Sequence, residues 1–141
     1  MPVPSNSISG DVRLVNDRDQ INALRDHIVE GAEGLGYPKA ACFAIRLALE
    51  EAIVNAFKHG HRTIPDKPIH VTFGVTPARV DICVEDQGPG FDPDAVPDPT
   101  ESEQIDAPSG RGLFLMRAYM SEVSYNPRGN CLRLRYERPG E

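Results

Sequence analysis

Residues 44–60 read AIRLALEEAIVNAFKHG, which is the pattern of a helix with two different faces. Glu51, Asn55 and Lys58 share one narrow arc, because residues i, i+4 and i+7 stack along a helix. A carboxylate, an amide and an ammonium on one arc suit a metal ion with its anionic ligand, and a plain solvated face has the same pattern. Roughly opposite, at about 100° per residue, lies an apolar arc that predicts contact with a core: Ile45, Leu49, Ala52, Ile53 and Ala56.

Upstream of this helix, the sequence predicts a short strand and another helix. Residues 12–14 alternate apolar and polar side chains, as a strand does. Asn16 or Asp17 can cap a helix that runs to about Glu33. The apolar stripe of that helix has helical spacing: Ile21, Leu24, Ile28 and Val29.

Downstream, the period of the pattern changes to two, which predicts strands. Residues 69–84 alternate on either side of a turn at 76–78, so they predict a hairpin with one apolar face. Residues 123–136 predict a second hairpin around a turn at 126–129, and residues 113–119 between the hairpins predict a short helix. These elements predict an α+β fold, a two-layer α/β sandwich with about three helices.

A glycine-punctuated turn, Asp86-Gln87-Gly88-Pro89-Gly90-Phe91, follows the first hairpin directly. Gly88 and Gly90 let the backbone approach a flat ligand closely, where a Cβ atom would clash. Asp86, unpaired at a strand end, can accept a hydrogen bond from an exocyclic amine. An ordinary acidic turn has the same residues. A calcium loop of the EF-hand kind is disfavoured, because it requires a glutamate where Pro97 stands.

A second glycine pair closes a long segment of different composition. Residues from about 92 to 110 are acidic and rich in proline, and a loop of this length predicts a lid or a disordered segment. It ends in Gly110-Arg111-Gly112-Leu113, where glycines lead straight into the predicted helix. Free N–H groups at a helix start bind anions, most naturally phosphates. The alternative is a flexible linker that precedes a helix. That alternative does not explain why a second pair of glycines occurs at the start of the helix.

Length and composition exclude several classes of protein. We expect one domain over residues 1–141. The net charge of −6 argues against nucleic acid and anionic membranes as partners. Neither a signal peptide nor a membrane span is predicted, so we expect a cytoplasmic protein. Three widely spaced cysteines suit buried, reduced thiols in that compartment: Cys42, Cys83 and Cys131.

Three of these patterns together resemble the Bergerat-fold ATPases, the superfamily of gyrase, mismatch-repair, chaperone and histidine-kinase ATP-binding domains. Residues 51–60 resemble their N-box. Asp86-x-Gly88-x-Gly90 resembles the first glycine box, and Gly110-x-Gly112-Leu113 resembles the second, with a lid between them. The resemblance extends from about residue 10 to residue 136. It implies the histidine-kinase-like ATPase fold, with a mixed, mostly antiparallel sheet.

Within that superfamily the chain is most similar to the small anti-sigma-factor serine/threonine kinases of the RsbW type, whose N-box has the form Glu-x-x-x-Asn-Ala-x-x-His-Gly. The resemblance implies an ATP- and Mg²⁺-dependent kinase that regulates transcription. Such a kinase phosphorylates a STAS-type antagonist protein and sequesters a sigma factor, and the resemblance also allows a homodimer. An alternative hypothesis is an ATP-binding regulatory module that lacks kinase activity and switches protein partners through its lid.

The resemblance also implies roles for single residues. Asn55 would coordinate Mg²⁺, Glu51 would be the general base that deprotonates a partner's serine, and Asp86 would bind the adenine amine. Glu50, about 100° round the same helix, is expected to point elsewhere. The acidic lid departs from the family pattern, which leaves lid contacts and the choice of partner open. The other expected nucleotide contacts are Lys58, Gly88, Gly90, Gly110, Arg111, Gly112 and Leu113.

Overall fold

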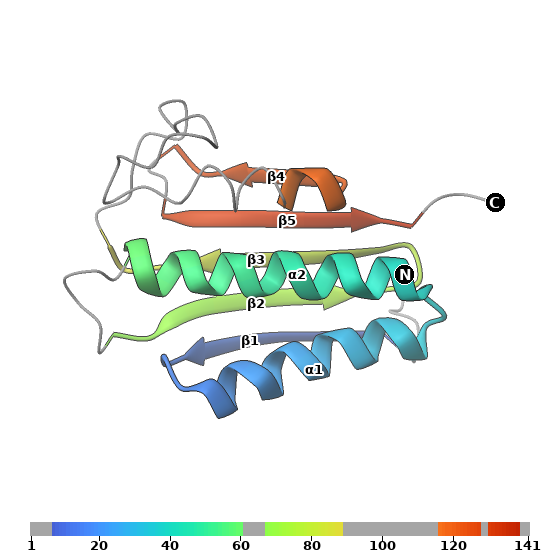
Figure 1. The fold of residues 1–141 in the computed structure, drawn as a ribbon, viewed down its shortest axis with the longest axis horizontal. Helices are drawn as coiled ribbons and strands as arrows, with labels where there is room; N and C mark the ends of the chain where they lie inside the picture. Colours follow the sequence, from blue (N-terminus) through green and yellow to red (C-terminus); the bar gives the residue numbers. More distant parts are fainter. Residues whose placement is uncertain (1–6, 61–66, 89–115, 128–129, 139–141) are drawn as a thin grey trace.

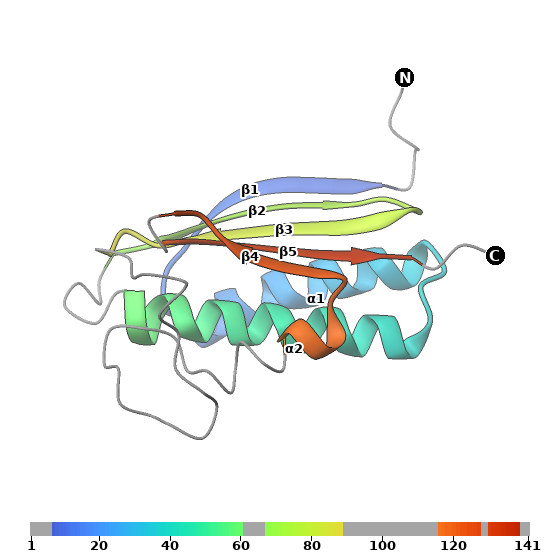
Figure 2. The same ribbon diagram turned by 90° about the horizontal axis from the view of Figure 1, so that it is seen from above.

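The computed structural model describes residues 7–60, 67–88, 116–127 and 130–138 of the chain. In this part, two long helices cover one face of a five-stranded sheet (Figures 1 and 2). This confirms the predicted two-layer α+β fold. Every strand pairing among the described residues is antiparallel, so the parallel component of a mixed sheet is absent from them. No helix in the same ranges is long and apolar enough to cross a membrane.

The elements follow one another along the chain as the sequence pattern predicts. The sheet order is β1-β2-β3-β5-β4. Residues 116–119 form a helical turn, which is the described part of the predicted short helix. In chain order the elements are β1 (Ile8–Leu14), α1 (Arg18–Gly34), α2 (Lys39–Asn55), the π-helical turn η1 (Ala56–Gly60), β2 (Ile69–Val75), β3 (Arg79–Glu85), β4 (Glu122–Tyr125) and β5 (Cys131–Glu137).

Helix α1 begins and ends within about a residue of the predicted positions. Asp17 is its N-cap, and the side chain accepts a hydrogen bond of 3.3 Å from the Asp19 N–H. After Leu35 the chain turns through Gly36, whose φ of 86° suits glycine because a Cβ atom would be strained there. The helix buries one stripe against the sheet: Ile21, Leu24, Ile28 and Ala32.

Helix α2 and the sheet form the centre of the core. The apolar arc predicted for the central helix is buried: Ile45, Leu49, Ala52, Ile53 and Ala56. Alternate residues of three strands face it, which confirms the period-two pattern, since side chains of a strand point to the two faces in turn. These inward residues are Ile69, Val71, Phe73, Val75, Val80, Ile82, Val84, Leu132 and Leu134.

The central helix does not stay α-helical to its end. Its last five residues, Ala56–Gly60, form a π-helical turn, and Gly60 ends the helix as predicted. Hydrogen bonds from i to i+5 place more residues in each turn than an α-helix has. Residues after Asn55 are therefore rotated from their expected positions, and Lys58 is the site residue that this rotation moves.

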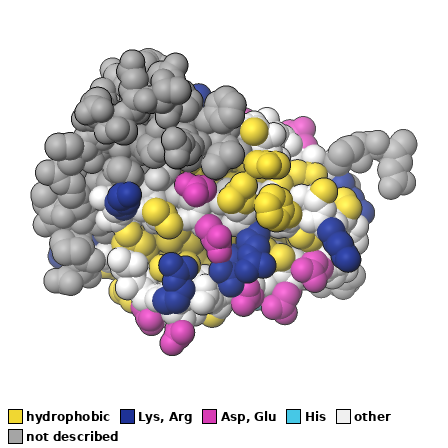
Figure 3. Space-filling view, viewed as in Figure 1, with side chains coloured by type: hydrophobic (Ala, Val, Ile, Leu, Met, Phe, Trp, Pro, Cys, Tyr) yellow, Lys and Arg dark blue, Asp and Glu magenta, His cyan; other side chains and the backbone are white. Residues whose placement is uncertain are grey.

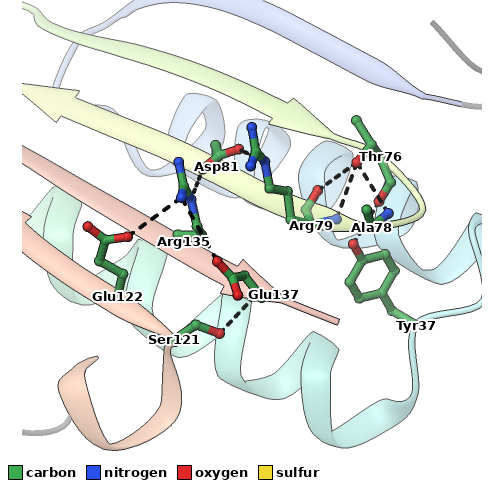
Figure 4. A network of polar contacts seen from close by, with 9 residues as sticks. All are labelled: Tyr37, Thr76, Ala78, Arg79, Asp81, Ser121, Glu122, Arg135 and Glu137. Atoms are coloured by element: carbon green, nitrogen blue, oxygen red, sulfur yellow. Dashed lines mark hydrogen bonds and ion pairs between the residues drawn. The ribbon is translucent and has the colours of Figure 1, made fainter. Parts of the chain in front are cut away.

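The sheet face opposite the helices is open and carries a network of ion pairs (Figures 2 and 4). Asp81 Oδ1 lies 2.7 Å from Arg135 Nε, and Asp81 Oδ2 lies 2.9 Å from Arg79 Nε. Arg135 also reaches Glu122 and Glu137, at 3.7 and 3.9 Å. These pairs join β3, β4 and β5 side by side, and oppositely charged cross-strand neighbours support the strand register.

The three cysteines are divided between the two layers. Cys42 is a buried residue of α2, as predicted. Cys83 and Cys131 are only half-buried, because they occupy outward positions of β3 and β5 on the open face. The prediction of three buried thiols is therefore wrong for these two.

The end of β5 is tied to the connection between α1 and α2. Arg138 donates hydrogen bonds of 2.9 and 2.8 Å to the carbonyl oxygens of Leu35 and Gly36. Its guanidinium carbon lies 4.9 Å from the ring centroid of Tyr37, a cation–π distance. The Tyr37 hydroxyl donates to the Thr76 carbonyl oxygen over 2.7 Å. These contacts join both layers at the end of the sheet opposite to the end of β3.

Candidate functional site

The predicted site residues come from two elements that lie at the same end of the sandwich. These are the end of α2 with η1, and the turn after β3, which stay together in both views (Figures 1 and 2). The described members are Glu51, Asn55, Lys58, Asp86 and Gly88. The predicted lid at about 92–110 and the remaining contacts lie outside the described residues: Gly90, Gly110, Arg111, Gly112 and Leu113.

Asn55, the last residue of α2, is buried, with 6% of its surface exposed. The polar arc is therefore not uniformly turned away from the core. The reason is that Asn55 lies only about 60° round the helix from the buried Ala52, at the border of the apolar arc.

The amide of Asn55 has an end that the protein does not use. Its Nδ2 atom is buried and has no hydrogen-bond partner among the described residues. Such groups are rare in native proteins, because burial without a partner costs about 1–3 kcal/mol. The two ends of a carboxamide have nearly the same shape, so a rotation of the amide presents the oxygen at the same place. An oxygen ligand for a hard cation fits this position.

Glu51 and Glu50, adjacent on α2, have different surroundings. Glu51 is half-buried one helical turn before Asn55 and has no hydrogen bond or ion pair to the described part of the chain. Glu50 Oε1 lies 2.6 Å from Nη1 of Arg25 on α1, and this hydrogen bond raises the pKa of the Arg25 guanidinium. Glu50 therefore points to α1, which confirms that prediction, and Glu51 is the carboxylate left beside Asn55.

Lys58 is not brought together with Asn55. It is exposed and borders a hollow of about 190 Å³ between α2 and the start of α1. The π-helical turn accounts for this, because it rotates Lys58 toward the side of the helix that carries Glu50 and Val54. The predicted arc of three side chains is thus wrong at Lys58, whose contact with a nucleotide stays a prediction. The hollow is lined by Asn16, Arg18, Ile21, Glu50, Ile53, Val54, Phe57 and Lys58.

Asp86 directly follows β3 and is not unpaired as predicted. Its Oδ1 accepts a hydrogen bond of 2.8 Å from the N–H of Gly88, which is buried. Next to it, Gln87 Nε2 donates to the carbonyl oxygen of Pro68 over 2.7 Å, so the turn is tied to the start of β2. A carboxylate has several acceptor positions, so a bond to Gly88 is compatible with a further donor.

Asn130, at the turn between β4 and β5, holds the backbone of Asp86, and Asn126 orients Asn130. The Asn130 carbonyl oxygen accepts from the Asp86 N–H over 2.9 Å, and Asn130 Nδ2 lies 3.4 Å from the Asp86 carbonyl oxygen. Asn126 Nδ2 donates to Asn130 Oδ1 over 2.7 Å. Asn126 Oδ1 accepts from the N–H groups of Asn130 and Cys131, at 3.0 and 3.1 Å.

The sequence signal for these asparagines is weak. Asparagine is common in turns, so Asn126 reads as part of a turn signal and nothing more. The bond from Asn130 to Asp86 spans 44 residues of the chain, and no local pattern reports such a contact.

Tyr125, at the end of β4, belongs to the same corner. Burial raises the pKa of its phenol, the charge of Asp86 raises it further, and Arg117 acts in the opposite direction. Since the raised pKa favours the neutral form, Tyr125 is an uncharged neighbour of the Asp86 carboxylate at neutral pH.

A magnesium ion fits this donor set if phosphates complete its shell. Within the described ranges, no group of three or more histidine, cysteine or acidic side chains is placed to hold a metal. Mg²⁺ does not require such a group, because it keeps most of its waters and takes one or two protein ligands beside phosphate oxygens. Asn55 is the described residue whose buried amide suits that role.

Curated proteins with similar sequences are serine kinases. Serine-protein kinase RsbW of Oceanobacillus iheyensis is 28% identical over 101 residues, which are 67% of this chain and 64% of that protein. Serine-protein kinase RsbW of Bacillus velezensis is 29% identical over 119 residues, 80% of this chain and 74% of that protein. Serine/threonine-protein kinase BtrW of Bordetella bronchiseptica is 32% identical over 88 residues, 61% and 62% of the two chains. The matches thus span about two thirds of the relatives' length.

A solved structure and a domain family agree with these similarities. The crystal structure of the RsbU and RsbW domains of Rv1364c from Mycobacterium tuberculosis matches with a TM-score of 0.62 and 20% identity, over 94% of this chain and 34% of that one. At this identity the likeness shows the fold. The resemblance to RsbW-type kinases is confirmed as a similarity of sequence and fold. Because the family match covers residues 14–136, the chain belongs to the family of histidine kinase-like ATPase domains.

Proposed function

We propose that this chain is an ATP-dependent protein serine/threonine kinase that acts as an anti-sigma factor. It phosphorylates a STAS-type antagonist protein and sequesters a sigma factor, which is released when the unphosphorylated antagonist competes. The names of the similar proteins, RsbW and BtrW, support the reaction class. The structural observation that supports it most is the buried, unpartnered amide of Asn55, one helical turn from the half-buried Glu51.

The nucleotide is held from both elements of the site. Asn55 supplies a ligand to Mg²⁺, which neutralises charge on the phosphates. Asp86 accepts a hydrogen bond from the adenine amine, in a position that Asn130 and Gly88 keep fixed. The further contacts proposed from the family motifs are Lys58, Gly90, Gly110, Arg111, Gly112 and Leu113.

Glu51 is the proposed general base. Phosphoryl transfer requires mainly positioning and charge neutralisation, with a carboxylate that orients or deprotonates the attacking hydroxyl. The carboxylate of Glu50 is engaged by Arg25 at 2.6 Å, whereas Glu51 has no such partner in the described part. Glu51 is therefore the carboxylate of α2 that can receive the proton of a serine.

Protein partners are supported by an apolar surface on the helical side. Hydrophobic side chains gather there over α2 and the helical turn at 116–119 (Figure 3). Phe43 is 57% exposed and Tyr119 is 44% exposed, and their rings pack edge to face with centroids 6.0 Å apart. Exposed apolar patches favour protein contacts. This surface suits a kinase that binds protein substrates. It suits equally the alternative function, an ATP-binding module that has no kinase activity and binds protein partners. A homodimer stays a prediction.

The test is phosphate transfer from labelled ATP to candidate STAS-type proteins. We expect transfer by the parent chain, and transfer slowed by about 10²- to 10⁴-fold in Glu51→Gln, the usual range for loss of a positioned acid–base group. ATP affinity, measured by calorimetry, stays within about threefold in that variant. Glu50→Gln is the matched control and keeps most of the transfer rate.

Two outcomes would contradict parts of this proposal. If Glu51→Gln transfers phosphate at the parent rate, Glu51 is not the base. If the parent chain binds ATP tightly and transfers phosphate to no candidate, the binding-module function replaces the kinase.

A further inference from the structure

Two cysteines are neighbours on the face of the sheet opposite to the helices. In the pairing of β3 with β5, Cys131 lies opposite Glu85, and Cys83 lies opposite Arg133. The two thiols are therefore diagonal neighbours on one face, and each shifts the pKa of the other. Both are free and half-buried, whereas Cys42 is buried. A reagent in solution can reach this pair.

The two thiols are chemically unequal. The pKa of Cys83 is lowered to about 7, mainly through hydrogen bonding with the neighbouring Cys131 thiol. Burial and the charge of Glu85 oppose the shift, and the charge of Arg133 adds to it. The same hydrogen bonding raises the pKa of Cys131. The thiolate is the nucleophilic form, so these directions make Cys83 the more reactive thiol of the pair.

A hollow bordered by two arginines lies beside Cys83. Its volume is about 270 Å³, and its outward lining side chains include Thr72, Asp81 and Cys83. Two arginines of β5 border it, and only Arg135 is neutralised, by its contacts with acidic residues. Arg133 is exposed and forms no ion pair within the described ranges. Because it faces Cys83 across the strands, Arg133 can attract a negatively charged reagent to the thiolate.

We propose that Cys83 is a thiol-modification site whose substrates are anionic, low-molecular-weight disulfides. The Cys83 thiolate attacks one sulfur of the disulfide and forms a mixed disulfide with it. The original sulfur–sulfur bond breaks, and the second half leaves as a thiolate that takes a proton from water. Cys83 is oxidised and the leaving thiol is reduced, so no other oxidant is required. Arg133 pairs with the carboxylate of the reagent, and Cys131 is a positioning residue that donates to the thiolate.

The experiment compares two disulfide probes on the full chain without nucleotide, the dianionic dithiobis(nitrobenzoate) and the neutral dithiodipyridine. We expect one fast-reacting thiol per chain at neutral pH, mapped to Cys83 by peptide mass spectrometry and absent from both Cys83→Ser and Cys83→Ala. Arg133→Gln slows the anionic probe by about tenfold and the neutral probe by less than about threefold, because charge steering acts on the anion alone. Thermal unfolding of each variant confirms that it is folded.

The role of Cys131 has its own readout in the pH profile. Cys131→Ala removes the donor, so the midpoint of the rate–pH curve rises from about 7 toward the ordinary thiol value. Cys131→Ser retains a hydroxyl donor and keeps the midpoint near that of the parent. The proposal is overturned if the fast thiol persists without Cys83, or if Arg133→Gln slows both probes equally. An unchanged midpoint in Cys131→Ala would remove the positioning role.

Discussion

At the scale of single residues, Asn55 combines burial with an amide end that no described group satisfies. An unsatisfied buried polar group is a free-energy cost that folding alone does not repay. Conflicts of this kind between a residue and its surroundings are typical of functional sites. Asn55 lies one helical turn from Glu51, so we infer that its unsatisfied amide serves the proposed site.

Replacement of Asn55 by leucine is expected to separate stability from function. Asn55→Leu removes the unpartnered amide and keeps the number and branching of the side-chain heavy atoms, so the free energy of unfolding without nucleotide stays equal or rises by about 1 kcal/mol. Binding of Mg·ATP falls by at least about tenfold, because the metal loses its protein ligand. Asn126→Leu is the control and lowers stability, since its amide is fully engaged. A strongly destabilised Asn55→Leu would show that the amide has a structural partner.

Asp86 is expected to determine the choice of base. Guanine presents a carbonyl oxygen where adenine presents an amine, so we expect much weaker binding of GTP than of ATP. A hydrogen bond to a charged group contributes about 1.5–3 kcal/mol, so Asp86→Asn weakens ATP binding by roughly 10- to 100-fold. Calorimetry with both nucleotides measures this. Equal affinities for ATP and GTP in the parent chain would refute the role of Asp86.

At the scale of elements, the turn between β4 and β5 acts on the turn after β3. Asn130 is 9% exposed and bonds to both backbone groups of Asp86, while Asn126 orients Asn130. The position of the Asp86 carboxylate depends on the position of the Asp86 backbone, which Asn130 holds. The proposed adenine contact therefore depends on a neighbouring hairpin.

Loss of Asn130 is expected to reduce nucleotide selectivity as well as stability. Asn130→Ala leaves the Asn126 amide and the Asp86 carbonyl without their partner, which lowers the free energy of unfolding by about 1–3 kcal/mol. A merely structural defect would weaken ATP and GTP binding alike. We expect instead that the ratio of the two affinities shrinks by about tenfold, as Asp86 is released from its position. Asn130→Asp, which keeps the acceptor for Asn126, should lie between the parent and Asn130→Ala in both measurements.

At the scale of the whole molecule, the two ends of the sandwich have different roles. One end holds the end of α2 and the turn after β3, which carry the proposed site residues (Figures 1 and 2). At the other end Arg138 bonds to the α1–α2 connection and stacks over Tyr37, which in turn bonds to Thr76. These contacts have no part in the proposed chemistry.

Arg138→Ala is therefore expected to lower stability without a change in nucleotide binding. Hydrogen bonds from a charged group to carbonyl oxygens, with the cation–π contact, predict a loss of about 1–3 kcal/mol. Denaturant unfolding measures the loss, and ATP affinity of the folded protein stays within about threefold. Arg133→Ala on the open face is the control, since Arg133 has no ion pair in the described part, and its effect should be within about 0.5 kcal/mol. An equal loss of stability in both variants would argue against a stabilising role for the contacts of Arg138 with the α1–α2 connection.

The sequence by itself determined the elements and their faces, because periodicity is a local property. The alternation in residues 69–84 and the apolar arc of α2 are both confirmed by burial. The sequence also placed the start of α1 at Asn16 or Asp17 and the end of the central helix at Gly60, since caps and stops depend on a few neighbouring residues. The structure selects Asp17 as the cap. The family motifs are also contiguous, and for that reason the match to histidine kinase-like ATPase domains could be anticipated.

Only the tertiary structure decided which polar groups meet. Asn55 is buried because it lies at the border of the apolar arc of α2. Lys58 is turned toward Glu50 because a π-helical turn follows α2, which helical periodicity does not report. The contact of Asn130 with Asp86 and that of Cys83 with Cys131 join residues far apart in the chain. Such contacts arise from the order in which strands pair, here β5 beside β3. The distances across a sheet depend on that pairing and not on the spacing of residues along any one strand.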